Sequence, residues 1–265
     1  MNGAGPSTSC KALYRDQWLV AVEKPPGVLS HPNPPRPGKG GRPARAAFEG
    51  PYDEAERRFD GPGGAVWLVH RLDQDTSGVL LAALDAATAA RCREVFEQGL
   101  VRKDYTALVA GLPAPRGVWK DSLVETRGAR QVRVAVRRGG PANAELRYEV
   151  VESSRPLGLA LLAVRLVTGR THQIRVQAAA RGHPLLGDDV YGDFGLNRWA
   201  RKEVGLRRLF LHAGGLELPH PVTGRTLAIR SGRPDDLAGV LARLGLDPAS
   251  GRGRSPGPRA RRRAD

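Results

Sequence analysis

A short polar segment carries the residue types that acid–base or nucleophilic chemistry requires. Residues 70–78 read HRLDQDTSG and lie between two apolar stretches at 66–69 and 79–84. Asp73 follows Arg71 by two positions, and a carboxylate held among positive charges at the rim of a sheet would stay ionised. Turns capped by aspartate, serine and threonine have the same composition. The residues alone therefore leave a catalytic loop and an ordinary capped turn equally open.

Two further segments carry side chains that could complete such a site. Residues 169–176 read GRTHQIRV, where Thr171 can cap a helix and Arg175 lies one turn into it. Arg175 could pair with a carboxylate of the first segment, and a solvated helix face is the alternative. Residues 102–105 read RKDY, and Tyr105 could present its ring to a base. Taken alone, Tyr105 is better explained as an ordinary strand aromatic.

Several kinds of site are excluded by the absence of their motifs. The sequence has no phosphate-binding loop, no dinucleotide fingerprint and no serine nucleophile elbow. Its six histidines lack the spacing of zinc ligands, and Cys10 and Cys92 cannot form a zinc site or a disulfide framework by themselves. No run approaches the ~20 apolar residues of a membrane helix, and no secretory signal is present. We expect a soluble cytoplasmic protein without a metal.

The charge balance predicts a polyanionic partner. The 265 residues include 42 basic and 27 acidic ones, which gives a formal net charge of +15. A positive charge of this size indicates the kind of binding partner rather than the fold. Nucleic acid is favoured as that partner over an anionic membrane or no polyanion. Residues 251–265 contain six arginines and one aspartate and should be disordered. Whether this tail is passive or binds phosphates is left open.

The elements that must position these residues are short strands with few helices. We expect strands at 13–22, 66–69, 79–84, 105–109 and 159–167, and short antiparallel strands over 118–151. Helices are expected at 86–98 with Asp85 as N-cap, at 171–181, from Asp235 onward and, weakly, at 44–59. Residues 32–43 are a proline- and glycine-rich loop. This pattern predicts the α+β class with a largely antiparallel sheet.

Taken together, the three polar segments resemble the signature of the RluA-type RNA pseudouridine synthases. HRLDQDTSG matches the catalytic loop of that family along its whole length. VTGRTHQIRV at 167–176, followed by GHPLLGDDVYG at 182–192, resembles the second long motif. Residues 24–28 resemble the family's opening motif, residues 103–107 resemble its tyrosine strand, and residues 209–224 resemble its closing strands. The resemblance runs from about residue 13 to residue 245.

The resemblance implies a fold and a domain organisation. It implies one catalytic domain of the pseudouridine synthase fold at 11–246, with a mixed, mainly antiparallel central sheet and flanking helices. A disordered lead at 1–10 and an arginine-rich tail at 247–265 would flank it, and 32–64 would be a loop region. The chain would be a member without the N-terminal RNA-binding domain that many relatives carry, and we expect a monomer.

The resemblance also implies an activity and roles for single residues. The activity is isomerisation of uridine in RNA to pseudouridine, in rRNA first and tRNA second, with no cofactor. Asp73 would be the essential carboxylate, as a nucleophile on the sugar or as a base, and Arg175 its partner. Tyr105 would stack on the uracil and remove the last proton, while Arg71 would fill the gap left by the flipped uridine. Further RNA contacts would come from His70, Thr76, Arg170, His172 and Gln173.

Two rival functions remain at this point. A non-catalytic RNA-binding protein could retain the fold, but phosphate binding alone needs none of Asp73, Tyr105 and Arg175 in particular. A hydrolase could use Asp73 as nucleophile on the glycosidic bond and release the base. Sequence separates this second rival poorly, because both reactions begin by loosening the same bond. Gln177 stands where many relatives have histidine, which puts only fine contacts in doubt.

Overall fold

The computed structural model describes residues 7–32, 45–127 and 132–246. Most of the proline- and glycine-rich loop, part of the expected lead and the arginine-rich tail lie outside these ranges. Residues 7–10 contact the core: Cys10 is buried, and the Thr8 hydroxyl donates to the Ala47 carbonyl at 2.6 Å. No helix in the described residues is long and apolar enough to cross a membrane.

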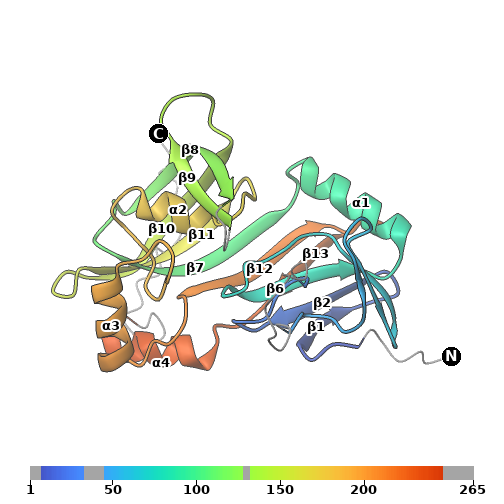
Figure 1. The fold of residues 1–265 in the computed structure, drawn as a ribbon, viewed down its shortest axis with the longest axis horizontal. Helices are drawn as coiled ribbons and strands as arrows, with labels where there is room; N and C mark the ends of the chain where they lie inside the picture. The colour runs from blue at the N-terminus through green and yellow to red at the C-terminus, as the bar shows by residue number, and fades with distance from the viewer. Residues whose placement is uncertain (1–6, 33–44, 128–131, 247–265) are drawn as a thin grey trace, which may run out of the picture.

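One sheet runs through the molecule, and four described helices lie against it (Figure 1). Its strands are β1 (Lys11–Arg15), β2 (Leu19–Lys24), β3 (Tyr52–Asp53), β4 (Arg58–Gly61), β5 (Gly64–Leu68), β6 (Ser77–Ala83), β7 (Arg102–Ala110), β8 (Arg116–Arg127), β9 (Val132–Arg137), β10 (Ala144–Ser154), β11 (Leu159–Leu166), β12 (Leu211–Pro219) and β13 (Thr226–Arg230). The helices are α1 (Ala86–Glu97), α2 (Gln173–Ala179), α3 (Phe194–Glu203) and α4 (Asp235–Leu244).

The strand order explains how distant segments meet. Along the main path the order is β3-β4-β5-β6-β12-β7-β11-β10-β8-β9, while β2 pairs with β6 and β13 with β12. Among the described strands only β6 and β12 pair in parallel, and the other pairs are antiparallel. The expected α+β class with a mixed, mainly antiparallel sheet is confirmed. The β6–β12 pair joins the N-terminal strands to the long strand β7.

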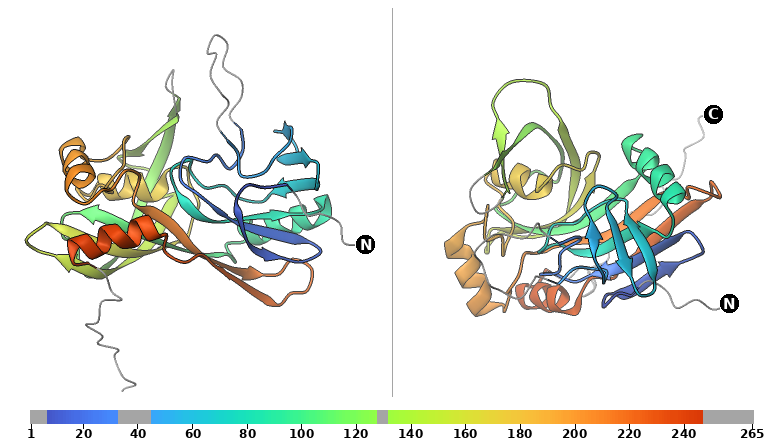
Figure 2. Two further views of the ribbon diagram at one scale, coloured as in Figure 1. Left: turned by 90° about the horizontal axis from the view of Figure 1, so that it is seen from below. Right: turned by 45° about the vertical axis from the view of Figure 1, so that its right-hand side comes forward.

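The two faces of β7 and β11 bury different cores because side chains alternate along a strand. Ala107 and Leu162 lie on the face that packs against Ile174 of α2. Leu108 and Leu161 lie on the opposite face, where α3 and α4 cover them. Figure 2 shows α4 lying against this second face. The sheet therefore has an α2 face and an α3/α4 face.

The strand expected at 13–22 and the helix expected at 44–59 are both wrong. The apolar stretch at 13–22 is not one strand but the hairpin of β1 and β2, because the Asp16 carboxylate accepts hydrogen bonds from the backbone N–H groups of Trp18 and Leu19 and forms a turn. The described residues 45–59 contain no helix. Gly50, at φ +111°, precedes Pro51, and the chain then enters the hairpin of β3 and β4.

The helix boundaries follow their capping residues. The Asp85 carboxylate accepts from the Thr88 N–H at 2.8 Å, as predicted for the start of α1, and α4 begins at Asp235. The helix expected at 171–181 is the shorter α2, and Thr171 does not cap it. Its hydroxyl donates to Glu125 instead, and His172 occupies the cap position. Helix α3, capped by Asp193, was not predicted.

Gly78 is the position where the β6–β12 pair tolerates no side chain. Its φ is +125°, and a Cβ atom would lie 2.2 Å from the Ala213 carbonyl oxygen. We expect Gly78→Ala to lower the free energy of unfolding by about 3 kcal/mol, through clash and backbone strain together. Gly158→Ala is the matched control, because Gly158 also has a positive φ (+61°) but no atom within 4 Å of its Cβ position. The control should lose only about 1 kcal/mol in urea unfolding. Equal losses would contradict the close-approach argument.

Candidate active site

The segment between β5 and β6 is held by buried polar contacts from the N-terminal strands. The Ser30 hydroxyl donates to the Leu72 carbonyl at 2.8 Å and accepts from the Leu72 N–H at 2.9 Å. The Gly27 N–H donates to the Gln74 carbonyl at 2.9 Å, and the Thr76 N–H donates to the Asp73 carbonyl at 3.2 Å. These bonds fix the backbone on both sides of Asp73.

Lys24 is a completely buried lysine beneath this segment. Its ammonium group donates to the carbonyls of Pro25, Val28 and Gln74 at 3.0, 2.7 and 2.8 Å. Burial lowers the pKa of Lys24 to about 8, against a smaller opposing effect of Asp75. Lys24 thus joins the end of β2 to the loop that carries Asp73. The sequence indicates only that Lys24 begins the opening motif at 24–28.

Asp73, Arg175 and Asp188 form a chain of ion pairs. Arg175 donates from Nε and Nη2 to the two oxygens of Asp188 at 2.7 and 2.8 Å, and from Nη1 to Asp73 Oδ2 at 3.3 Å. The Asp188 side chain is fully buried, whereas that of Asp73 is 19% exposed. The predicted pairing of Arg175 with a carboxylate of the first segment is therefore present. Asp188 was not singled out, although it lies in the GDDVYG stretch.

Electrostatics favours the charged forms of the buried pair. Burial opposes the ionised form of Asp188, but the hydrogen bonds and charge of Arg175 outweigh it, and the pKa of Asp188 lies below its ordinary value. Burial likewise opposes the cation at Arg175, yet the two carboxylates raise the pKa of Arg175 above its ordinary value. Arg175 also lies over the ring of Tyr191, with Cζ 5.2 Å from the ring centroid. The guanidinium is thus a permanent positive charge beside Asp73.

Tyr105 and His172 complete the surroundings of Asp73. Burial, together with a smaller effect of the Asp73 charge, raises the pKa of Tyr105, so its phenol is protonated at neutral pH. His172 Nε2 lies 4.0 Å from Asp73 Oδ2, and its Nδ1 shares a hydrogen bond of 2.9 Å with the Tyr191 hydroxyl. Burial lowers the pKa of His172 although Asp73 opposes this, which favours the neutral ring.

The other residues predicted to contact RNA differ in accessibility. Arg71 and Arg170 are exposed, and Arg170 Nε donates to the Asn143 carbonyl at 3.1 Å. Gln173 is buried, with its side chain bonded to Thr168, Glu145 and the Arg170 N–H.

His70 and Thr76 flank Asp73 in the sequence but have different surroundings. His70 Nε2 accepts from the Leu81 N–H at 2.9 Å, and its ring stacks on Phe96, so it faces α1 and β6. Thr76 is buried, and its hydroxyl has no hydrogen-bond partner among the described residues.

The matching family model, the relatives and the solved structure all point to the same family. The family model described as RNA pseudouridylate synthase matches residues 18–180. The chain is 36% identical to tRNA pseudouridine synthase C of Salmonella typhi over 88% of this chain and 89% of the relative. It is 35% identical to ribosomal large subunit pseudouridine synthase C of Haemophilus influenzae over 88% of this chain and 68% of the relative. The solved structure titled human RNA pseudouridylate synthase domain containing 4 is similar at a TM-score of 0.64 and 26% identity, covering 88% of this chain and 92% of that one.

Asp188 should be essential for the stability of this site. Replacing it by asparagine leaves the buried Arg175 without its compensating charge, so Asp188→Asn should lower the free energy of unfolding by about 3–5 kcal/mol in urea titration. Asp193→Asn is the control, since asparagine caps a helix about as well as aspartate and should cost below ~0.5 kcal/mol. A small loss in Asp188→Asn would show that Asp188 does not compensate Arg175.

His70 should make the fold sensitive to acid. Burial lowers its pKa to about 3, whereas an unfolded histidine titrates near ~6.5. Between these two pH values the unfolded chain binds more protons, so acid lowers the free energy of unfolding. Between pH 6.5 and pH 5 the titration of His70 should lower the free energy of unfolding by about 2 kcal/mol. This loss should be missing from His70→Gln when the free energy of unfolding is measured at both pH values. The same pH dependence in both proteins would refute a neutral, buried His70.

Proposed function

Because the chain belongs to the RNA pseudouridylate synthase family and is an isomerase acting on uridine in RNA, we propose that Asp73 is the carboxylate that starts the reaction. The observation that carries this proposal is the ion pair of Asp73 with the buried Arg175. Arg175 is fixed on its other side by both oxygens of Asp188, so it cannot turn away from Asp73. A carboxylate placed in this way is partly desolvated and is held in one orientation by a positive charge.

The free oxygen of Asp73 gives the proposal its geometry. Oδ2 accepts from Arg175, while no side chain or backbone N–H of a described residue donates to Oδ1. Oδ1 is thus available to the ribose of the target uridine. It could attack the sugar carbon or remove the 2′ proton, and both steps need an ionised oxygen at the sugar. The bond from ribose to nitrogen breaks, the uracil turns, and a bond from ribose to carbon replaces it, so no electrons are lost or gained.

Tyr105 would contact the target base, and Arg71 would contact the RNA around it. Tyr105 lies near enough to Asp73 for the carboxylate charge to affect its pKa, and its ring would stack on the uracil. Being protonated at rest, it would accept the last proton only after giving up its own. Arg71 is exposed two positions from Asp73 and would occupy the gap left by the flipped uridine. The Thr76 hydroxyl, which was expected to contact RNA, is buried, so we assign it no RNA contact.

The substrate is a uridine in structured RNA, and both tRNA and rRNA are candidates. Relatives of nearly equal identity carry names that refer to tRNA and to the large ribosomal subunit. The net charge of +15 suits either polyanion. With RNA as substrate, we place the protein in the cytoplasm, and we propose that it acts as a monomer.

Asp73→Asn should abolish turnover without abolishing binding, because it removes the charged oxygen while preserving the shape of the side chain. The measurement is tritium release from RNA labelled at carbon 5 of uracil, with total tRNA and total rRNA as separate substrates. Affinity for RNA should stay within about threefold of the wild type, because one carboxylate is not a phosphate contact. Asp75→Asn is the matched control, since Asp75 is an exposed carboxylate of the same loop.

The outcomes separate the rival functions. Release by the wild type and by Asp75→Asn, but not by Asp73→Asn, supports the assignment. Substantial release by Asp73→Asn would overturn the role of Asp73. Free uracil in the product would indicate a hydrolase, because an isomerase leaves the mass of the RNA unchanged. No release from either RNA by any of the proteins, with binding intact, would favour an RNA-binding protein that retains the fold.

A further inference from the structure

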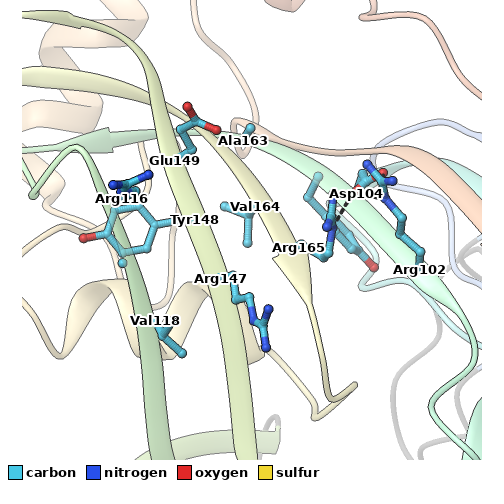
Figure 3. A pocket seen from close by; sticks show the side chains of 12 residues that line it. Arg102, Asp104, Arg116, Val118, Arg147, Tyr148, Glu149, Ala163, Val164 and Arg165 are labelled. Atoms are coloured by element: carbon cyan, nitrogen blue, oxygen red, sulfur yellow. Dashed lines mark hydrogen bonds and ion pairs between the residues drawn. The ribbon is translucent and has the colours of Figure 1, made fainter. Parts of the chain in front are cut away.

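The α3/α4 face of the sheet is only partly covered. Leu108 and Leu161 pack under α3 and α4, but the same face continues along β7 and β11 to Asp104 and Arg165. Here β7, β8, β10 and β11 line a hollow of about 500 Å³ (Figure 3). Tyr105 and Val164 alternate with these residues and also border the hollow, but both pack in the core cluster that contains Ile174 of α2, so their side chains point to the α2 face. The hollow therefore lies on the side of the sheet opposite to α2 and Arg175.

A row of arginines crosses this face. The strand register aligns Val118, Arg147, Arg165, Asp104, Gly215 and Arg230 across six strands. Adjacent strands lie ~4.8 Å apart, and Arg147 and Arg230 lie four strands apart, so their Cα atoms are separated by about 19 Å. The Arg147 side chain is 66% exposed, and Arg165 and Arg230 are about half exposed. The row is long enough to follow several groups of an extended polyanion.

Asp104 organises the arginines within this row. It pairs with Arg102 at 2.9 Å, with Arg165 at 3.2 Å and with Arg230 at 3.3 Å. Glu217 also pairs with Arg230 at 3.6 Å, so two carboxylates face three guanidinium groups and the cluster keeps a positive excess. Gly215 is part of this arrangement, because a Cβ atom there would lie 2.1 Å from Arg230 Nη1. The missing side chain is what lets Arg230 lie across β12 toward Asp104.

The hollow combines this charge with apolar surface. Four arginines and two carboxylates line it, and Val118, which is 52% exposed, and Ala163 lie among them. Figure 3 shows Arg147 between Val118 and Arg165 on neighbouring strands. Guanidinium groups bind phosphates through paired N–H donors and also stack on flat rings. Phosphates at the rim with a base on the apolar part would use both features of the hollow.

We propose that this hollow and the arginine row form a second RNA-contact site, which binds a single-stranded segment remote from the target uridine. The proposal rests on RNA as the substrate but not on the role of Asp73. A nucleotide in the hollow cannot reach Asp73, because the sheet separates the two. The RNA would therefore pass around the sheet and be held on both faces. An acidic peptide matches the charge but leaves the apolar surface beside Val118 unused, so RNA is the favoured occupant.

The test removes two charges without disturbing Asp104. Arg116 and Arg147 line the hollow and make no ion pair with Asp104 among the described residues, so Arg116→Gln with Arg147→Gln should fold normally. The probe is a fluorescein-labelled octamer of adenylate, which contains no uridine. At 0.1 M salt its affinity should fall roughly tenfold, and the slope of log K against log salt should fall by about 0.7 per lost contact. With substrate RNA, KM should rise while kcat stays unchanged.

The controls distinguish binding at this site from the general electrostatic attraction of a basic protein for RNA and from binding at the active site. Arg91→Gln with Arg201→Gln removes the same charge from exposed positions on α1 and α3. Equal weakening by both pairs, or no weakening by the first, would overturn the proposal. Asp73→Asn should bind the octamer like the wild type, so failure of the catalytic assignment would leave this result unaffected. A hexaglutamate peptide is the comparison probe. If only its binding depended on Arg116 and Arg147, the site would bind acidic protein segments and the RNA proposal would fall.

Discussion

The site depends on one requirement, the compensation of a guanidinium group buried in the interior. Removing Arg175 from water is costly unless carboxylates replace its hydration. Asp188 does this permanently, with both oxygens bonded and its side chain fully buried. Asp73 supplies the remaining contact at a longer distance and stays partly exposed. The arginine therefore has one fixed partner and one partner that can respond to a ligand, and the proposed role of Asp73 requires this asymmetry.

The fold brings these partners together from separate halves of the sheet. Asp73 comes from the connection of β5 to β6, whereas Arg175 and Asp188 follow β11. The two halves meet where β6 pairs with β12 in parallel, and Gly78 permits that close approach because it has no side chain. Lys24 then fixes the loop from below by bonding the Gln74 carbonyl. The position of one carboxylate thus rests on a backbone contact, a buried ammonium group and an ion pair, each in a different part of the chain.

Sequence reasoning succeeded where local rules decide the structure and failed where distant contacts do. The start of α1 at Asp85 follows from a capping side chain. The pairing of Asp73 with Arg175 is the exception among distant contacts, because the resemblance of both motifs to one family implied it. The role of Asp188 could not be read from local rules, because its partner Arg175 lies 13 residues away on α2. The same holds for Thr171, which could have capped α2 but bonds instead to Glu125 on β8. Local propensity offers a choice of partners, and tertiary contacts select one.

Strand β7 shows how one element can serve two surfaces. Tyr105 faces the α2 side and lies close enough to Asp73 for the two groups to interact, while its neighbour Asp104 faces the opposite side and binds three arginines. Because side chains alternate along a strand, a shift of one residue in the register of β7 would exchange these environments. It would place a carboxylate in the apolar core and a ring among guanidinium groups. The two surfaces therefore constrain the same register, and the pairing that positions Tyr105 beside Asp73 also places Asp104 among its arginines.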